Sequence, residues 1–221
     1  MKTHRTQRPR RTAAIVLIAI SAFMTSFIII WCANGVMDFL NYLGINRSTL
    51  QLPYALMLVA ATAAGYILYT AQMIPEVRRN LFCFKGIFKW LGIYAALVGG
   101  IVEEAVFRQM LMDWLHDSGT GTLLQVILSA LAFGLTHYTW TLQGGNLRTG
   151  TASAASTVVL GALLASVYIA AGRNLLPAIA AHALINIFVE PWLILNAIQA
   201  TPTRRESDSS DIRNDNRRIS R

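Results

Sequence analysis

A run of 19 residues without charge occupies positions 13–31 and reads AAIVLIAISAFMTSFIIIW. Two further uncharged runs follow at 52–74 and 151–172. At a rise of about 1.5 Å per residue, a helix over any of these runs can cross about 30 Å of hydrocarbon. The chain of 221 residues is 54% hydrophobic and only 14% charged, too little charge to cover the surface of a soluble domain. The sequence therefore predicts a membrane protein.

Three more apolar segments, at 90–112, 121–140 and 174–198, are interrupted by isolated polar residues. With the uncharged runs they make about six spans. Continuous apolar segments of this length are typical of transmembrane helices, because a helix satisfies all of its own backbone polar groups in lipid. We predict an all-α, polytopic transmembrane helix bundle over residues 13–198.

The positions of the basic residues predict which way this bundle faces. Sixteen Lys and Arg residues lie on one side of the six-span arrangement, and only Arg47 and Arg173 lie on the other. The sixteen are distributed over 1–12, 75–89, 141–150 and 199–221. Lys and Arg accumulate in cytoplasmic loops. We therefore expect a multi-pass protein of the cell membrane with both termini cytoplasmic, and no nucleic-acid partner is needed to explain the net charge of +8.

The two ends of the chain differ from the bundle in composition. Residues 1–12 form a basic segment that we expect in the cytoplasm. Residues 199–221 are charged, polar and almost free of large apolar side chains. Such a segment cannot bury a core, so we expect a disordered cytoplasmic tail.

The segment at 90–112 holds three charged residues well inside an apolar stretch. They are Glu103, Glu104 and Arg108. Inserting an ionisable side chain near the bilayer centre costs about 2.5–3.5 kcal/mol of free energy or more. A cluster of three therefore indicates a structural or functional role. Glu104 and Arg108 are four residues apart and share one helix face, whereas Glu103 points about 100° away. A structural cluster that joins helices remains an alternative to a functional site at this point.

Two other interrupted segments carry polar residues at the same spacing of four. His137 follows Phe133, and Asn186 follows His182. We predict a turn near His116–Gly121, on the same side of the membrane as Arg173. Counted from these two positions at about 1.5 Å per residue, Glu103, His137, His182 and Asn186 lie about 14–24 Å into the bilayer, and so within about 10 Å of depth. We predict that they line one polar cavity.

A carboxylate, two imidazoles and a carboxamide in one site have a chemistry in common. A buried glutamate can act as a general base, a histidine can hold the same water, and His or Asn side chains can donate to an oxyanion. The set is therefore suited to peptide-bond hydrolysis. No nucleophilic-serine motif, no pair of aspartates within the spans and no HExxH motif points to another protease class.

Three motifs in this order resemble those of a known family. Residues 103–108 read EEAVFR, 133–137 read FGLTH and 182–186 read HALIN, which fit EExxxR, FxxxH and HxxxN. Together they are similar to the CPBP (CAAX protease and bacteriocin-processing, or Abi) family of intramembrane glutamic endopeptidases. The resemblance covers a protease core of about 87–195. It implies that the substrate is a membrane-associated peptide or protein, and the shortness of the chain favours a bacterial member whose substrate need not be prenylated.

The resemblance also implies a role for each motif residue. Glu103 would be the catalytic base, and His137 would help it to activate water. His182 and Asn186 would form the oxyanion site. The supporting residues would be Glu104, Arg108, Phe107 and Phe133.

Other functions remain open at this point. The family pattern implies no cofactor, but two histidines and a carboxylate also suit zinc, with Glu103, His137 and His182 as ligands of a metal-dependent version of the protease. A second alternative is a non-catalytic membrane factor for immunity or partner binding. A transporter is a more distant alternative, because no paired repeats are visible. Glu190, directly before Pro191, is expected at a helix end or kink.

Overall fold

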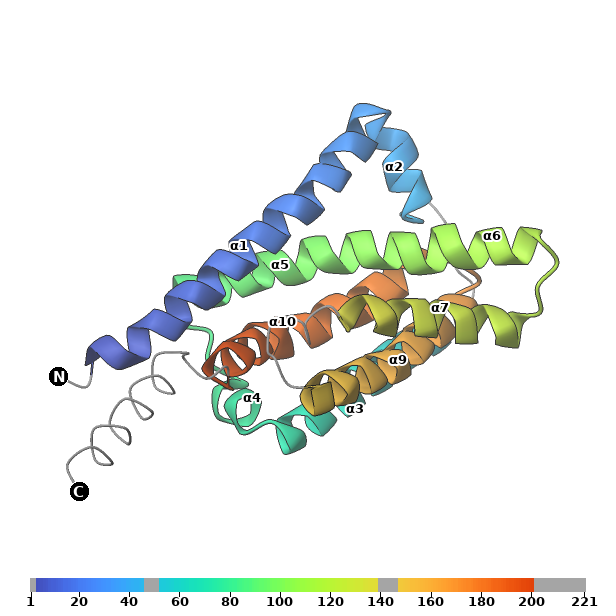
Figure 1. The fold of residues 1–221 in the computed structure, drawn as a ribbon. Helices are drawn as coiled ribbons and strands as arrows, with labels where there is room; N and C mark the ends of the chain where they lie inside the picture. Colours follow the sequence, from blue (N-terminus) through green and yellow to red (C-terminus); the bar gives the residue numbers. More distant parts are fainter. Residues whose placement is uncertain (1–2, 46–51, 139–146, 201–221) are drawn as a thin grey trace, which may run out of the picture.

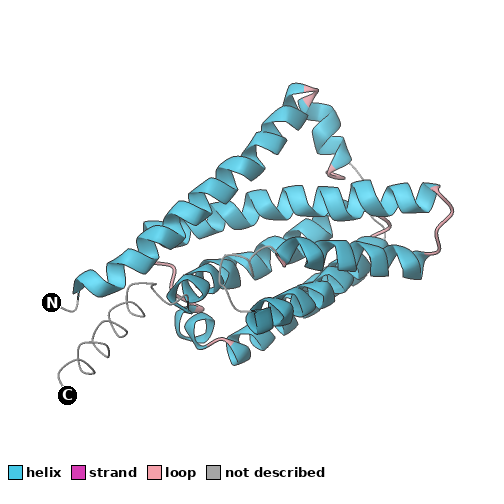
Figure 2. Ribbon diagram, viewed as in Figure 1, coloured by secondary structure: helices cyan, strands magenta, loops and turns pink. Residues whose placement is uncertain are grey.

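The computed structural model describes residues 3–45, 52–138 and 147–200. These residues form an all-α transmembrane bundle, and no strand occurs in any of the three ranges (Figure 2). In chain order the helices are α1 (Thr3–Ala33), α2 (Val36–Tyr42), α3 (Leu52–Met73), α4 (Pro75–Asn80), α5 (Ile87–Glu104), the π-helix η1 (Ala105–Met110), α6 (Leu111–Asp117), α7 (Thr122–His137), α9 (Leu147–Ala170) and α10 (Leu175–Ala200).

The long helices agree with most of the predicted spans. Five are long and apolar enough to cross a membrane, at Pro9–Ala33, Pro53–Met73, Ile87–Asp117, Gly150–Ala170 and Leu175–Gln199. The span predicted at 121–140 contains the shorter apolar helix α7, which has 16 residues. The chain is therefore a multi-pass membrane protein.

Two parts of the predicted outline differ in the structure. The helix containing Pro9 begins at Thr3, so it already includes most of the basic segment 1–12. The span predicted at 90–112 extends over Ile87–Asp117, because α5, η1 and α6 run on without a break. The predicted tail at 199–221 lies almost entirely outside the described residues.

Lys89 is buried, although the prediction counts it in the cytoplasmic segment 75–89. It lies in the first turn of α5 and is fully buried. A lysine near the end of an apolar run normally extends to the interface, so the sequence does not predict this burial. The start of α5 lies at the end of the bundle that holds both termini (Figure 1), so the basic bias is unchanged.

The helix α10 lies at the centre of the bundle and packs against α5, α3, α1 and α9 (Figure 1). Glycines allow close approach along two of the helix contacts. A Cβ atom on Gly134 of α7 would lie 2.2 Å from the side chain of Val158 on α9, and one on Gly92 of α5 would lie 2.1 Å from Cγ of Pro191 on α10. Small residues at such contacts are typical of membrane bundles, where close van der Waals packing replaces the hydrophobic effect.

The short helix α2 turns back after α1 (Figure 1). Gly35 makes the reversal with a φ of 141°, a conformation that other residues rarely adopt. The ring of Trp31 then packs on Phe39 at a centroid distance of 5.8 Å. The sequence reading contained no helix here, because seven residues are too few for a span.

The beginning of α1 and the end of α10 lie at the same end of the bundle (Figure 1). The turn between α6 and α7, at residues 118–121, lies at the opposite end. We expect the end that holds both termini to face the cytoplasm, because of the basic bias. Reporter fusions after residue 118 and at the C-terminus measure this directly. An external C-terminus would contradict the six-span arrangement.

Candidate active site

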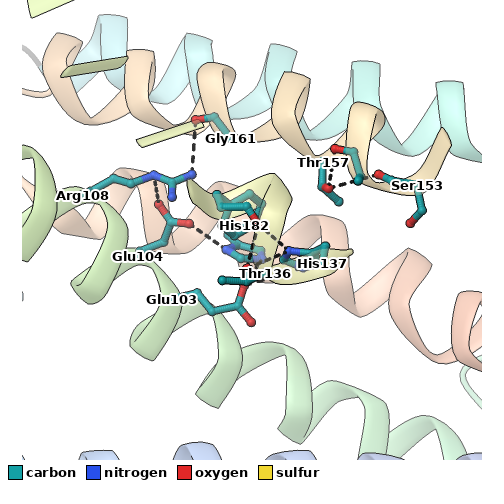
Figure 3. Close-up of polar contacts among 11 residues, drawn as sticks. Glu103, Glu104, Arg108, Thr136, His137, Ser153, Thr157, Gly161 and His182 are labelled. Carbon is teal, nitrogen blue, oxygen red and sulfur yellow. Dashed lines mark hydrogen bonds and ion pairs between the residues drawn. The ribbon is translucent and has the colours of Figure 1, made fainter. Parts of the chain in front are cut away.

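Three of the four predicted catalytic side chains meet inside the bundle, each from a different helix (Figure 3). Glu103 comes from the last turn of α5, His137 from the end of α7 and His182 from α10. The Oε2 atom of Glu103 lies 4.0 Å from Nε2 of His137 and 3.8 Å from Nε2 of His182. The predicted proximity of Glu103, His137 and His182 is therefore present in the structure.

Asn186 lies on α10 one turn beyond His182 and is half-buried. The spacing of four residues puts the two side chains on one face of the helix. Its predicted role as an oxyanion donor stays a prediction.

Glu104 occupies a different environment from its neighbour Glu103. Its side chain is fully buried, and its Oε2 atom forms an ion pair with Nε of Arg108 at 2.9 Å. Its other oxygen, Oε1, lies 2.8 Å from Nδ1 of His182. The predicted pairing of Glu104 with Arg108 is therefore present, and the same carboxylate also holds a residue of α10.

Arg108 extends this buried cluster toward α9. Its Nη2 donates to the carbonyl of Gly161 at 3.3 Å, and its guanidinium lies 4.8 Å from the ring centre of Phe133 (Figure 3). The planar guanidinium of Arg108 therefore places a positive charge directly beside the carboxyl group of Glu104.

These partners fix the tautomers of the two histidines. A carboxylate and a carbonyl can only accept hydrogen bonds, so the nitrogen facing each of them must carry the proton. In His182, Nδ1 donates to Glu104. In His137, Nδ1 donates to the carbonyl of Phe133 at 2.9 Å. Both rings consequently turn Nε2 toward Glu103, as a lone pair when the ring is neutral and as a donor when it is protonated.

The aromatic residues predicted as supporting groups hold this arrangement from one side. Phe133 is completely buried, and its ring centre lies 4.6 Å from that of His137 and 5.6 Å from that of His182. Phe107 packs edge-on against Phe133 at 5.4 Å. Phe133 therefore restricts the rotation of both histidine rings.

The helix that carries the first motif is not a regular α-helix, contrary to the prediction. Residues Ala105–Met110 form a π-helix between Glu104 and the end of the span. Such π turns are rare and are found mostly at functional sites. The carbonyl of Phe107 within this turn accepts a hydrogen bond of 2.9 Å from Ser129 on α7. The periodicity of the apolar residues does not predict a single π turn.

Two further residues lie near the site. Ser129 was not predicted, although it precedes Phe133 by four residues and His137 by eight, a spacing that could have revealed it. Glu190 was expected at a helix end or kink; α10 continues through Pro191 to Ala200, so Glu190 lies inside the helix, directly before its internal proline. Among the described residues, its buried Oε2 atom has no hydrogen-bond partner.

The zinc alternative requires Glu103, His137 and His182 to surround one ion. Within the described ranges, no group of three or more His, Cys, Asp or Glu residues is arranged to hold a metal. The separations of 3.8 and 4.0 Å from Glu103 exceed the roughly 3.3 Å expected between ligands of a tetrahedral zinc site with bonds near 2.0 Å. The side chains as placed do not fit zinc, and the alternative stays a prediction for experiment.

The segment that supplies these motifs also matches a known family. Residues 85–188 match the family described as type II CAAX prenyl endopeptidase, Rce1-like. No curated protein and no solved structure matches the chain. The matched segment runs from the residues before α5 to the middle of α10, and so contains all three motifs.

The match over residues 85–188 agrees with the resemblance inferred from the three motifs, and with the helical bundle it supports a membrane-embedded protein of the CAAX-protease type.

The buried carboxylate of Glu104 allows a test of the cluster. We expect Glu104→Gln to lower the free energy of unfolding by about 3–5 kcal/mol, because Arg108 would be left as an unpaired buried charge. The measurement is unfolding of the purified protein in detergent micelles. The control is Glu76→Gln, which removes the partly exposed pair with Arg79 and should cost at most about 1 kcal/mol. Equal costs for the two variants would contradict the role of Glu104.

Proposed function

We propose that this protein is an intramembrane endopeptidase in which Glu103 activates water. The proposal rests mainly on the position of the Glu103 carboxylate, which faces Nε2 of two histidines while its neighbour Glu104 is already engaged by Arg108. Glu103 is also the more accessible of the two glutamates, with a side chain that is 20% exposed against 0% for Glu104. A base must reach both water and substrate, so Glu103 is better suited than Glu104.

The distance between Glu103 and His137 supports a shared water. At 4.0 Å the two atoms are too far apart for a direct hydrogen bond. One water oxygen about 2.8 Å from each would bridge them. His137 with its proton on Nδ1 offers a lone pair at Nε2, so it accepts one hydrogen of that water while Glu103 accepts the other.

Hydrolysis of the peptide bond would then proceed in two steps. Glu103 removes one proton from the water as its oxygen bonds to the peptide carbonyl carbon, and the carbonyl oxygen becomes an oxyanion. The C–N bond then breaks, and the proton held by Glu103 passes to the departing amine. The products are a carboxylic acid and an amine.

His182 and Asn186 are proposed to stabilise the oxyanion. Asn186 can donate through its amide group. His182 can donate through Nε2 only as an imidazolium, because Nδ1 already gives its proton to Glu104. In that form, the carboxyl group of Glu104 would lie 2.8 Å from the positively charged ring. This coupling gives Glu104 a proposed electrostatic role in addition to its structural one.

We propose a membrane-associated peptide or protein as the substrate. The site lies inside a transmembrane bundle, so the scissile bond has to be presented at the membrane. A peptide that carries a prenylated CAAX end is the first probe, because the matched family is described by that chemistry.

We expect Glu103→Gln to reduce cleavage by about 10²–10⁴-fold, because the amide keeps the shape but cannot take the proton. The assay uses purified protein in lipid vesicles with a farnesylated fluorogenic CAAX peptide. It is paired with comparative peptidomics of membranes carrying the wild type or the variant, which can also identify another substrate. Glu76→Gln on α4 serves as the control and should retain activity. Unchanged cleavage by Glu103→Gln would remove Glu103 from the chemistry. If the wild type cleaves no peptide in either experiment, the non-catalytic alternative is favoured.

Metal dependence is tested separately. We expect purified enzyme to stay active after prolonged chelator treatment, because the proposed mechanism uses only protein side chains and water. Elemental analysis and activity are measured on the same sample. Stoichiometric zinc together with chelator-sensitive activity that zinc restores would establish the metal-dependent alternative, with Glu103, His137 and His182 as the first residues to test as ligands.

A further inference from the structure

Lys89 is a buried cation at the end of the bundle opposite the α6–α7 turn. Its side chain is surrounded by three aromatic rings, with Nζ 4.7 Å from the ring centre of Phe84 and 5.7 Å from those of Phe188 and Trp192. In the part of the chain that the structure describes, no Asp or Glu forms an ion pair with it. Instead, Nζ donates a hydrogen bond to the backbone carbonyl of Ile187 on α10.

The carbonyl of Ile187 lacks its usual hydrogen-bond donor within α10. In an α-helix, the carbonyl of Ile187 would accept from the N–H of residue 191. Residue 191 is a proline, which has no N–H, and it lies inside α10. A buried carbonyl without a donor is costly, most of all inside a membrane. Lys89 supplies the donor that Pro191 cannot.

The same region of α5 is also shaped to fit the proline. Gly92 lies three residues after Lys89, and a Cβ atom there would come within 2.1 Å of Cγ of Pro191. Any larger residue at position 92 would push the two helices apart. Lys89 and Gly92 therefore hold α5 against the irregular part of α10 through one polar contact and one steric contact.

The contact between α5 and α10 continues from this point to the candidate active site. Gly100 packs on the backbone of Ala183, and Glu104 then bonds to His182. The position of α10 along α5 is thus set at one end by Lys89 and at the other by Glu104. Asn186 lies on α10 between these two contacts, at Ile187 and His182.

We propose that Lys89 is a positioning residue, whose ammonium group replaces the missing N–H of Pro191 and thereby fixes the part of α10 that carries His182 and Asn186. Its effect on cleavage rests on the proposed function. The pairing of Lys89 with Pro191 does not, and it can be measured without activity.

The test is a double-mutant cycle of Lys89→Met, Pro191→Ala and the two together. Methionine keeps an unbranched apolar side chain among the aromatic rings but removes the donor. Alanine at position 191 restores the backbone N–H to Ile187. We expect Lys89→Met alone to lower kcat by about tenfold, as a buried carbonyl loses its donor, and to change kcat by less than about twofold when Pro191→Ala is present. KM should change little in either case.

A matched control and a readout that does not depend on activity complete the design. Lys85→Met removes an exposed lysine four residues away and should have no effect. Hydrogen exchange of the α10 amides over residues 183–195 should increase in Lys89→Met and return toward the wild-type rate in the double variant. If Lys89→Met does not fold, the yield of folded protein is measured instead. Recovery of that yield when Pro191→Ala is added would support the pairing of Lys89 with Pro191.

The outcomes separate this proposal from the proposed function. Equal effects of Lys89→Met with and without Pro191→Ala, in exchange and in folded yield, would overturn the pairing. If the exchange cycle shows coupling but no peptide is cleaved, the pairing stands and the proposed protease activity fails. Coupling in exchange with unchanged kcat would overturn the positioning role alone.

Discussion

The structure depends on one buried carboxylate. Glu104 is shared between the guanidinium of Arg108 and the imidazole of His182, and it has no exposed surface. A charge in this position is tolerated in a membrane only because both of its oxygens have partners. Those partners lie on different helices, so satisfying the charge also fixes where α10 stands relative to α5. The neighbouring Glu103 is then left facing two histidine nitrogens.

A second constraint is that backbone groups in a membrane bundle must be satisfied wherever a helix is irregular. At two irregular places among the described residues, a neighbouring helix supplies a side-chain donor. Ser129 donates to the carbonyl of Phe107 in the π turn, and Lys89 donates to the carbonyl of Ile187 before Pro191. Both irregularities lie in the helices that carry the motifs. Both irregular segments are held by contacts between helices. The geometry of the candidate site therefore depends on the packing of the bundle.

Two adjacent glutamates have different environments although they have the same side chain. In a helix, successive residues point about 100° apart, so the two carboxylates face different neighbours. Glu104 points into the dry contact among α10, η1 and α9, where a fixed charge organises the structure. Glu103 points toward His137 at the partly exposed end of α7 and toward His182 in α10, and its own side chain is partly exposed. This difference is the physical basis for proposing Glu103, and not Glu104, as the base.

The sequence by itself determined the membrane-spanning character, the turn near 118–121, the pairing of Glu104 with Arg108 and the common depth of Glu103, His137 and His182. These follow from apolar length and from distance along a helix, which are local properties of the chain. It did not reveal the π turn, the burial of Lys89 or the proton positions on the histidines. Each of these depends on which side chain a neighbouring helix presents, and only the tertiary structure decides that.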